Sequence, residues 1–180
     1  MFLYDRNMNK VEARKYGQKQ RAMISKEDQK QRSNKIKEQV VSRIKPNQCV
    51  GCYVSINDEV DTKEIIDYCF RNQIKICVPK VVGRTLEFFI IHDWNDLTEG
   101  SFHVLEPHTN EKIEVEQIDV MLVPLSAYDS NYNRCGYGKG YYDSILEHCS
   151  LKIGLAFLEQ EVDEIEAEPF DISLDDVIVG

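Results

Sequence analysis

The chain has 180 residues, of which 42% are hydrophobic and 29% are charged, a composition typical of a globular domain with a sizeable core. It carries 22 Lys and Arg against 31 Asp and Glu, and the net charge of −9 disfavours general binding to nucleic acid or to membrane surfaces. No apolar run approaches the length of a membrane span, and the N-terminus lacks a signal-peptide core. We therefore expect one domain over residues 1–180, a monomer in the cytoplasm, with no nucleic-acid or membrane partner.

Two helices are predicted before Pro46. The first covers about residues 9–23 and places Lys10 and Arg14, which are four residues apart, on one face. On charge alone, such a face is more often solvated than functional. The second helix begins at Ser25, which opens a capping-box-like sequence, and continues with apolar residues at helical spacing.

A strand–helix–strand unit follows these helices. Gln48–Ser55 is the predicted first strand, Asp61 or Thr62 can cap the next helix, and Ile74–Pro79 is the second strand. This spacing predicts a parallel, right-handed βαβ unit. Thr85–Ile91 is predicted as a third strand.

The chain has six cysteines, and two of them form a CxxC motif at Cys49 and Cys52. A zinc site needs a second ligand pair at suitable spacing, and the sequence offers none. A redox motif needs a helix start, whereas this motif lies inside a strand-like run. We interpret both residues as small members of a buried strand, and all the cysteines as free thiols.

The most informative stretch of the chain begins with another strand. The apolar run Ile118–Val123 predicts a strand buried on both faces, and Pro124 ends it. A turn-rich loop follows, then the glycine-rich stretch Arg134–Gly140, then a predicted helix at Ser144–His148. This order is typical of phosphate binding, because loop N–H groups and a helix dipole both favour an anion.

The glycine-rich loop also carries formal charges. Arg134 can bind phosphate as a bidentate fork and Lys139 as a mobile point charge. Asp143 follows where a carboxylate could hold Mg²⁺. The spacing matches neither a Walker A loop nor a dinucleotide fingerprint, so loop chemistry alone supports phosphate binding and a flexible surface turn about equally.

The C-terminal part completes the predicted fold. Leu151–Phe157 is predicted as a buried strand, residues 159–169 as a solvated acidic segment, and Val177–Val179 as the last strand. The expected fold class is α/β, a three-layer α/β/α sandwich with a mostly parallel sheet. Ligands in such sheets bind beyond the carboxyl ends of the strands, where the glycine-rich loop is expected to lie.

The string PLSAYDSNYNRCGYGKGYYDSIL closely resembles the signature of the 5-formyltetrahydrofolate cyclo-ligase family, also called 5,10-methenyltetrahydrofolate synthetases. Tyr132 and His103 stand where the family usually has Gly. A Gly position can require a positive φ, which Asn131 and Asn133 adopt more readily than Tyr132, so we expect these neighbours to take it over. Other departures from the family pattern are Leu125, Ser126, Tyr128, Cys135 and Phe170. Further matches in family order lie at 10–14, 59–62, 100–107 and 170–179.

The resemblance implies an enzyme that closes 5-formyltetrahydrofolate to 5,10-methenyltetrahydrofolate and converts ATP to ADP and phosphate. The γ-phosphoryl group passes to the formyl oxygen, and N10 of the same molecule then attacks the formyl carbon. ATP and 5-formyltetrahydrofolate are therefore the implied small-molecule partners, with Mg²⁺ as the implied cofactor.

The family's functional residues carry over at matching positions. The resemblance implies Arg134 and Lys139 as catalytic residues and Asp143 and Asp171 as ligands of Mg²⁺. The implied ATP contacts are Lys10, Arg14, Arg134, Cys135, Gly136, Tyr137, Gly138, Lys139, Gly140, Tyr141 and Tyr142. The implied substrate contacts are Arg14, Val54, Glu59, Tyr137, Gly138, Lys139, Gly140 and Tyr141, with Tyr137 and Tyr141 at the seam between the two ligands. Phe102 and Glu106 are further pocket candidates.

Other interpretations stay open. A non-catalytic folate- or nucleotide-binding module on the same scaffold is suggested by the changes at Tyr132 and His103, and folate-dependent ATP consumption would exclude it. A phosphosugar isomerase-like enzyme would act without ATP and would leave Asp143 and Asp171 without a role. Taken alone, Glu59 is a surface turn residue and His103 an exposed histidine.

Overall fold

The computed structural model describes residues 7–100 and 103–180. Within these ranges the central sheet has seven strands, in the order β13-β11-β8-β2-β3-β4-β7. The strands from β13 to β3 run parallel, and β4 and β7 add an antiparallel edge. This confirms the mostly parallel sheet. The strand bounds are β2 Cys49–Cys52, β3 Lys75–Val82, β4 Thr85–Ile91, β7 Lys112–Ile113, β8 Val120–Val123, β11 Lys152–Ala156 and β13 Asp176–Val179.

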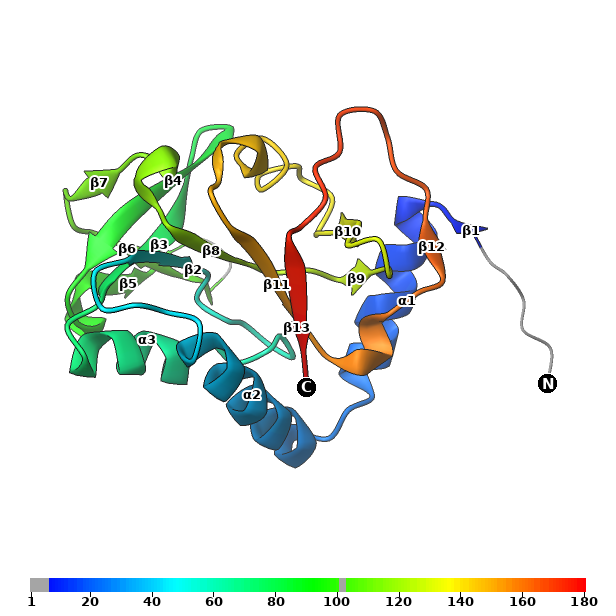
Figure 1. The fold of residues 1–180 in the computed structure, drawn as a ribbon, viewed down its shortest axis with the longest axis horizontal. Helices are drawn as coiled ribbons and strands as arrows, with labels where there is room; N and C mark the ends of the chain where they lie inside the picture. The colour runs from blue at the N-terminus through cyan, green and yellow to red at the C-terminus, as the bar shows by residue number, and fades with distance from the viewer. Residues whose placement is uncertain (1–6, 101–102) are drawn as a thin grey trace.

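Two helices, α2 (Lys26–Val41) and α3 (Lys63–Arg71), cover one face of the sheet (Figure 1). Ser25 caps α2 as predicted, since its side chain accepts a hydrogen bond from the backbone N–H of Asp28. Thr62 is the residue before α3, but the Asp61 carboxylate accepts from the first helical N–H. The parallel pair β2 and β3 is joined through α3, which confirms the predicted strand–helix–strand unit.

The opposite face of the sheet is covered by turns and short 3₁₀ helices. These include η3 (Val115–Gln117) and η4 (Leu146–His148). The predicted helix at Ser144–His148 is therefore wrong as an α-helix. The backbone hydrogen bonds of this segment mostly join residues three apart, as in 3₁₀ turns, for example from the N–H of Ile145 to the carbonyl of Tyr142 and from that of Cys149 to the carbonyl of Leu146.

The helix α1 (Lys10–Ala22) lies beside the sheet, next to a hairpin of β9 (Ala127–Tyr128) and β10 (Arg134–Cys135) (Figure 1). Asn9 and Met23 cap its ends, in agreement with the predicted range. The contact is close, since a Cβ at Gly17 would lie 2.0 Å from the carbonyl oxygen of Ser126. This close backbone contact fixes α1 against the hairpin of β9 and β10.

The acidic segment 159–169 is less solvated than predicted. Gln160, Val162 and Ile165 are buried in it. It starts within η5 (Leu158–Gln160), which packs on α1. Its strand β12 (Glu164–Ile165) pairs in parallel with β1 (Asn7–Met8). The acidic side chains alternate with apolar ones that cover α1.

Two smaller features complete the fold. The strands β5 (Leu97–Glu99) and β6 (Leu105–Pro107) pair antiparallel after η1 (Trp94–Asp96), and β6 packs against β3. All the cysteines are free and buried, which confirms the interpretation of Cys49 and Cys52 as strand residues. Across the described part of the chain, no helix has the length and apolar character needed to cross a membrane.

Candidate active site

The carboxylate of Asp129 shapes the turn between β9 and β10. It accepts hydrogen bonds from the backbone N–H groups of Asn131 at 2.9 Å and Asn133 at 3.0 Å, and from that of Ile165 at 2.9 Å. Tyr132 itself takes the positive φ, 62°, so the expectation that Asn131 or Asn133 would take it over is wrong. Asp129 binds the N–H groups on both sides of Tyr132, and this leaves the left-handed position of the turn to Tyr132.

Arg14 of α1 reaches beneath the glycine-rich loop. Its Nε donates to the carbonyl oxygen of Gly136 at 2.7 Å. Gly138 has a φ of 91°, and a Cβ there would lie 3.0 Å from Cζ of Arg14. Position 138 therefore needs glycine for two reasons, its left-handed backbone and its close contact with Arg14.

A cavity of about 520 Å³ opens over this loop. Lys10 and Arg14 reach it from α1, Asp143 from the turn after the loop, and Asp171 from the C-terminal segment. Every residue with an implied ATP contact lines it, as do both candidate metal ligands. The lining residues are Lys10, Arg14, Leu86, Pro124, Arg134, Cys135, Gly136, Tyr137, Gly138, Lys139, Gly140, Tyr141, Tyr142, Asp143, Glu168, Phe170 and Asp171.

The two candidate metal carboxylates are each paired with a cation. Nη2 of Arg134 lies 2.8 Å from Oδ1 of Asp143, and Lys10 pairs with Asp171 and, at 3.3 Å, with Glu168. No cluster of three or more His, Cys, Asp or Glu suited to a metal occurs among the described residues. Mg²⁺ typically takes one or two protein carboxylates together with substrate phosphates. This donor set therefore fits Mg²⁺ that arrives with a nucleotide.

Two buried polar groups at this cavity have no hydrogen-bond partner within the described ranges. They are Nε of Arg134 and the hydroxyl of Tyr142. The Arg134 side chain is 3% exposed, and its Cζ lies 6.0 Å from the ring centroid of Tyr142. Burial lowers the pKa of Arg134, against the opposing charge of Asp143, and raises the pKa of Tyr142. Such groups are costly to leave unsatisfied, so a ligand is expected to contact them.

A second cavity of about 210 Å³ adjoins the first. Val54 and Glu59, which carry implied substrate contacts, line it together with the pocket candidate Glu106 of β6. The two cavities share part of their walls. The shared residues are Leu86, Pro124, Tyr137 and Tyr142.

The seam between the cavities differs from the predicted one in one residue. Tyr137 lies there as expected. Tyr141 lines the first cavity, and Tyr142 takes its place at the seam. The chain after Gly140 forms turns and not the expected helix, which changes which of the two neighbouring rings faces inward.

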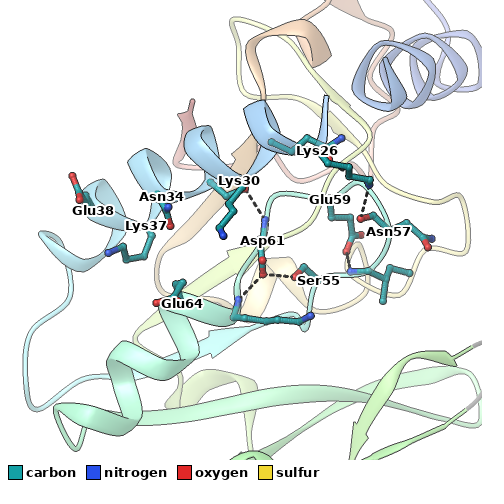
Figure 2. A pocket seen from close by; sticks show the side chains of 14 residues that line it. Lys26, Lys30, Asn34, Lys37, Glu38, Ser55, Asn57, Glu59, Asp61 and Glu64 are labelled. Atoms are coloured by element: carbon teal, nitrogen blue, oxygen red, sulfur yellow. Dashed lines mark hydrogen bonds between the residues drawn. The ribbon is translucent and has the colours of Figure 1, made fainter. Parts of the chain in front are cut away.

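Glu59 is a buried carboxylate on the segment between β2 and α3, 8% exposed (Figure 2). It accepts hydrogen bonds from the Tyr137 hydroxyl at 2.5 Å and from the backbone N–H of Ile56 at 2.8 Å. Burial raises its pKa, and these two hydrogen bonds oppose that effect. Its burial excludes the surface-turn interpretation. An ionised carboxylate accepts hydrogen bonds only, so Glu59 suits a ligand ring that carries N–H donors.

Comparison with known proteins shows the family of the chain. The sequence model of the 5-formyltetrahydrofolate cyclo-ligase family matches residues 6–180. The chain belongs to this family of enzymes. It is 31% identical to the 5-formyltetrahydrofolate cyclo-ligase of Mycoplasma pneumoniae, over 95% of this chain and 98% of the relative. The cyclo-ligase of Haemophilus influenzae is 25% identical, over 89% of this chain and 91% of the relative.

Solved structures of family members share the fold. The 5,10-methenyltetrahydrofolate synthetase of Mycoplasma pneumoniae superposes with a TM-score of 0.78 at 29% identity, covering 95% of this chain and 98% of that one. The synthetase of Aquifex aeolicus gives a TM-score of 0.85 at 29% identity, covering 94% of this chain and 89% of that one. The folate cyclo-ligase fold thus extends over nearly the whole chain.

The backbone is left-handed at both positions where this chain replaces a usual family glycine. Tyr132 has a φ of 62° and His103 a φ of 59°. The His103 side chain is exposed, which confirms the interpretation of a surface histidine, and it pairs with Glu99. The pocket candidate Phe102 lies outside the described residues. Both residues thus adopt a backbone conformation that glycine adopts readily and other residues rarely do.

Sequence reasoning missed Arg21, a buried residue in the last turn of α1. Its guanidinium contacts Asp58 and the Tyr137 hydroxyl, and so lies behind the seam of the two cavities. A signal was available, because Lys10, Arg14 and Arg21 are spaced by four and seven residues and share one helix face. The cyclo-ligase motif names only the first two of these residues, so the third was passed over.

Proposed function

We propose that the chain catalyses the ATP- and Mg²⁺-dependent closure of 5-formyltetrahydrofolate to 5,10-methenyltetrahydrofolate, with release of ADP and phosphate. The observation that carries this proposal is the pair of adjoining cavities with opposite chemistry. One collects Lys10, Arg14 and the glycine-rich loop, and the other holds the buried carboxylate of Glu59. They meet at Tyr137 and Tyr142, so a nucleotide in the first would touch a folate in the second.

The reaction needs an activated formyl group. A formamide is a poor electrophile because its nitrogen donates electrons into the carbonyl, and its oxygen is a poor leaving group. Transfer of the γ-phosphoryl group of ATP to that oxygen solves both problems. N10 of the same molecule then attacks the formyl carbon and loses its proton, the C–O bond breaks, and phosphate leaves with the former formyl oxygen. Because N10 is already in place, the closure gains from proximity.

The protein's part is to position the groups and to neutralise charge. Backbone N–H groups of Gly136–Gly140 would contact the phosphates, and Arg134 and Lys139 would stabilise the transferring phosphoryl group. Lys10 and Arg14 would bind ATP from the α1 side, and Arg14, beneath Gly138, would also reach the substrate. Lys10 now pairs with Asp171, and a bound metal would take over that carboxylate and leave Lys10 for the nucleotide.

Asp143 and Asp171 would hold Mg²⁺, which would neutralise phosphate charge when bound with ATP. In the folate cavity, Glu59 would accept hydrogen bonds from ring N–H groups, and Val54 would pack on the ring. Tyr137 and Tyr142 would lie at the seam between the nucleotide and the substrate, and Tyr141 would line the nucleotide side. The unpartnered Nε of Arg134 and the hydroxyl of Tyr142 would gain ligand partners.

The test is turnover by purified protein with ATP, Mg²⁺ and 5-formyltetrahydrofolate, followed by the absorbance of the methenyl product and by phosphate release. We expect one phosphate to be released for each molecule of methenyl product. Without ATP or without the folate, we expect neither product nor phosphate. Folate binding without product would instead support the binding-module alternative. That alternative was motivated by Tyr132 and His103, both of which have a left-handed backbone, the conformation that glycine adopts readily.

A further inference from the structure

Arg21 lines neither ligand cavity and yet contacts both sides of the site. It is 4% exposed. Its Nε and Nη2 lie 3.1 and 3.0 Å from Oδ1 of Asp58, on the folate-side segment. Nη1 donates to the carbonyl oxygen of Leu125 at 3.2 Å, and Nη2 donates to the Tyr137 hydroxyl of the glycine-rich loop at 3.4 Å. One side chain of α1 thus connects the two loops that form the site.

The direction of these hydrogen bonds is fixed by their chemistry. A guanidinium donates and never accepts, so the oxygen of Tyr137 is the acceptor from Arg21. The single hydroxyl proton of Tyr137 is then free to be donated to Oε1 of Glu59. The backbone N–H of Ile56 donates to the other oxygen of Glu59. The donors from Tyr137 and Ile56, with Arg21 behind Tyr137, therefore favour the ionised form of Glu59 and oppose the effect of its burial.

We propose that Arg21 is a positioning residue that holds Glu59, through Tyr137 and Asp58, as a hydrogen-bond acceptor for the folate. The inference rests on the proposed function, in which Glu59 accepts hydrogen bonds from the folate. Under this proposal, α1 positions a folate-binding residue in addition to contacting ATP. The arrangement links the nucleotide loop and the folate loop, because Tyr137 lies on the first and Glu59 on the second.

The charges around Glu59 support this role. Burial raises the pKa of Glu59, the Tyr137 and Ile56 hydrogen bonds and the Arg21 charge lower it, and the Asp58 charge raises it. Other titratable groups near it are the buried hydroxyls of Tyr53 and Tyr142, and Glu106 of β6 in the same cavity. Glu59 also lines a hollow whose charged residues are Lys26, Lys30, Lys37, Glu38, Asp61, Lys63 and Glu64 (Figure 2). Arg21 and Asp58 thus act on Glu59 with opposite signs.

The experiment measures the pH dependence of kcat/KM for 5-formyltetrahydrofolate in Arg21→Gln, Asp58→Asn and Arg21→Lys. The acid limb reports the group that must be ionised in the free enzyme. Arg21→Gln removes a positive charge, so its acid limb should move to higher pH. Asp58→Asn removes a negative charge, so its acid limb should move to lower pH. Arg21→Lys restores the charge without the fork, so its acid limb should return toward wild type while KM for the folate stays raised.

We expect KM for the folate to rise by roughly tenfold or more in Arg21→Gln, since a buried charged hydrogen bond is lost. KM for ATP should change less. The matched control is Lys19→Gln, an exposed cation on the same helix, which should leave both profiles unchanged. In a Tyr137→Phe background, Arg21→Gln should add less than it does alone, because the hydroxyl that links Arg21 to Glu59 is gone.

Acid limbs that stay at the wild-type pH in both Arg21→Gln and Asp58→Asn would overturn the proposal, as would equal rises of KM for ATP and folate. If Arg21→Gln does not fold, Asp58→Asn and Tyr137→Phe still decide it. Calorimetric titration of the folate across pH gives a readout that needs no turnover. Suppose that wild-type protein binds the folate but forms no product, while the pH dependence of folate binding shifts in the variants as expected. This result would refute the proposed function and leave the role of Arg21 standing.

Discussion

Arg14 and Gly138 lie in direct contact, although 124 positions separate them in the sequence. The Cζ of Arg14 would be 3.0 Å from a Cβ at position 138, and its Nε holds the carbonyl oxygen of Gly136 at 2.7 Å. The glycine-rich loop is therefore shaped from below by a side chain of α1. Changes in this contact should weaken nucleotide binding more than they destabilise the fold.

Gly138→Ala should lower kcat/KM for ATP by roughly 10- to 100-fold, because small displacements of positioning groups carry costs of that size. The new Cβ forces Arg14 away and strains a backbone with a φ of 91°. Steady-state kinetics would measure this effect. Gly83→Ala is the matched control, because Gly83 also has a positive φ, 62°, but has open space around it. Equal kinetic losses in both variants would contradict the role of the Arg14 contact.

Tyr132→Gly should stabilise the protein by about 0.5–1 kcal/mol. A left-handed non-glycine residue costs about 1–2 kcal/mol, and the added freedom of glycine in the unfolded chain offsets part of the gain. Urea unfolding followed by circular dichroism would measure the difference. Tyr132→Ala keeps the Cβ and should not stabilise. If Tyr132→Ala stabilised as much as Tyr132→Gly, the cause would be loss of the ring and not relief of the backbone.

Gly17→Ala should destabilise the protein by about 1–3 kcal/mol through overpacking, even though alanine favours a helix over glycine by about 1 kcal/mol. The added Cβ would lie 2.0 Å from the carbonyl oxygen of Ser126, and backbone cannot move aside easily. Denaturant midpoints would measure the loss. Lys19→Ala on the exposed side of α1 is the control and should change stability little. A Gly17→Ala protein as stable as wild type would show that α1 can shift without loss.

Asp143→Asn and Asp171→Asn should each raise the Mg²⁺ concentration needed for ADP binding by at least about tenfold, since each removes a candidate metal ligand. Calorimetry of ADP at several Mg²⁺ concentrations measures this without turnover. Asp143→Asn should also cost stability, because it leaves the buried Arg134 without its ion pair. Asp163→Asn, an exposed carboxylate outside the cavity, is the control. If ADP binding depended on Mg²⁺ in the same way in Asp143→Asn, Asp171→Asn and Asp163→Asn, the metal assignment would be contradicted.

Local patterns in the sequence predicted much of the fold. The buried strand at 118–123, its end at Pro124 and the charged glycine loop are all encoded within one stretch, so their order along the chain suffices to place the loop beyond the carboxyl end of a strand. The caps of α1 and α2 are likewise local, because a polar side chain and the first helical N–H groups are neighbours in sequence. These features needed no knowledge of distant contacts.

What the sequence did not predict depends on contacts between distant segments. Arg21 gains its role from Asp58 and Tyr137, which the fold brings together from three separate elements. Tyr142 lies at the seam in place of Tyr141 because the chain there forms turns and not the predicted helix. The pattern of apolar residues in this segment is compatible with turns and with a helix. The left-handed Tyr132 was misassigned because Asp129, which fixes the turn, also bonds to Ile165 far along the chain.

The measurement that tests the account most directly uses 5-formyltetrahydrofolate with ¹⁸O in its formyl group. The protein would turn it over with unlabelled ATP and Mg²⁺, and mass spectrometry would detect the label in the released phosphate. Phosphorylation of the formyl oxygen predicts one ¹⁸O in each phosphate formed with the methenyl product. Product whose phosphate carries no label would contradict the proposed transfer between the two cavities.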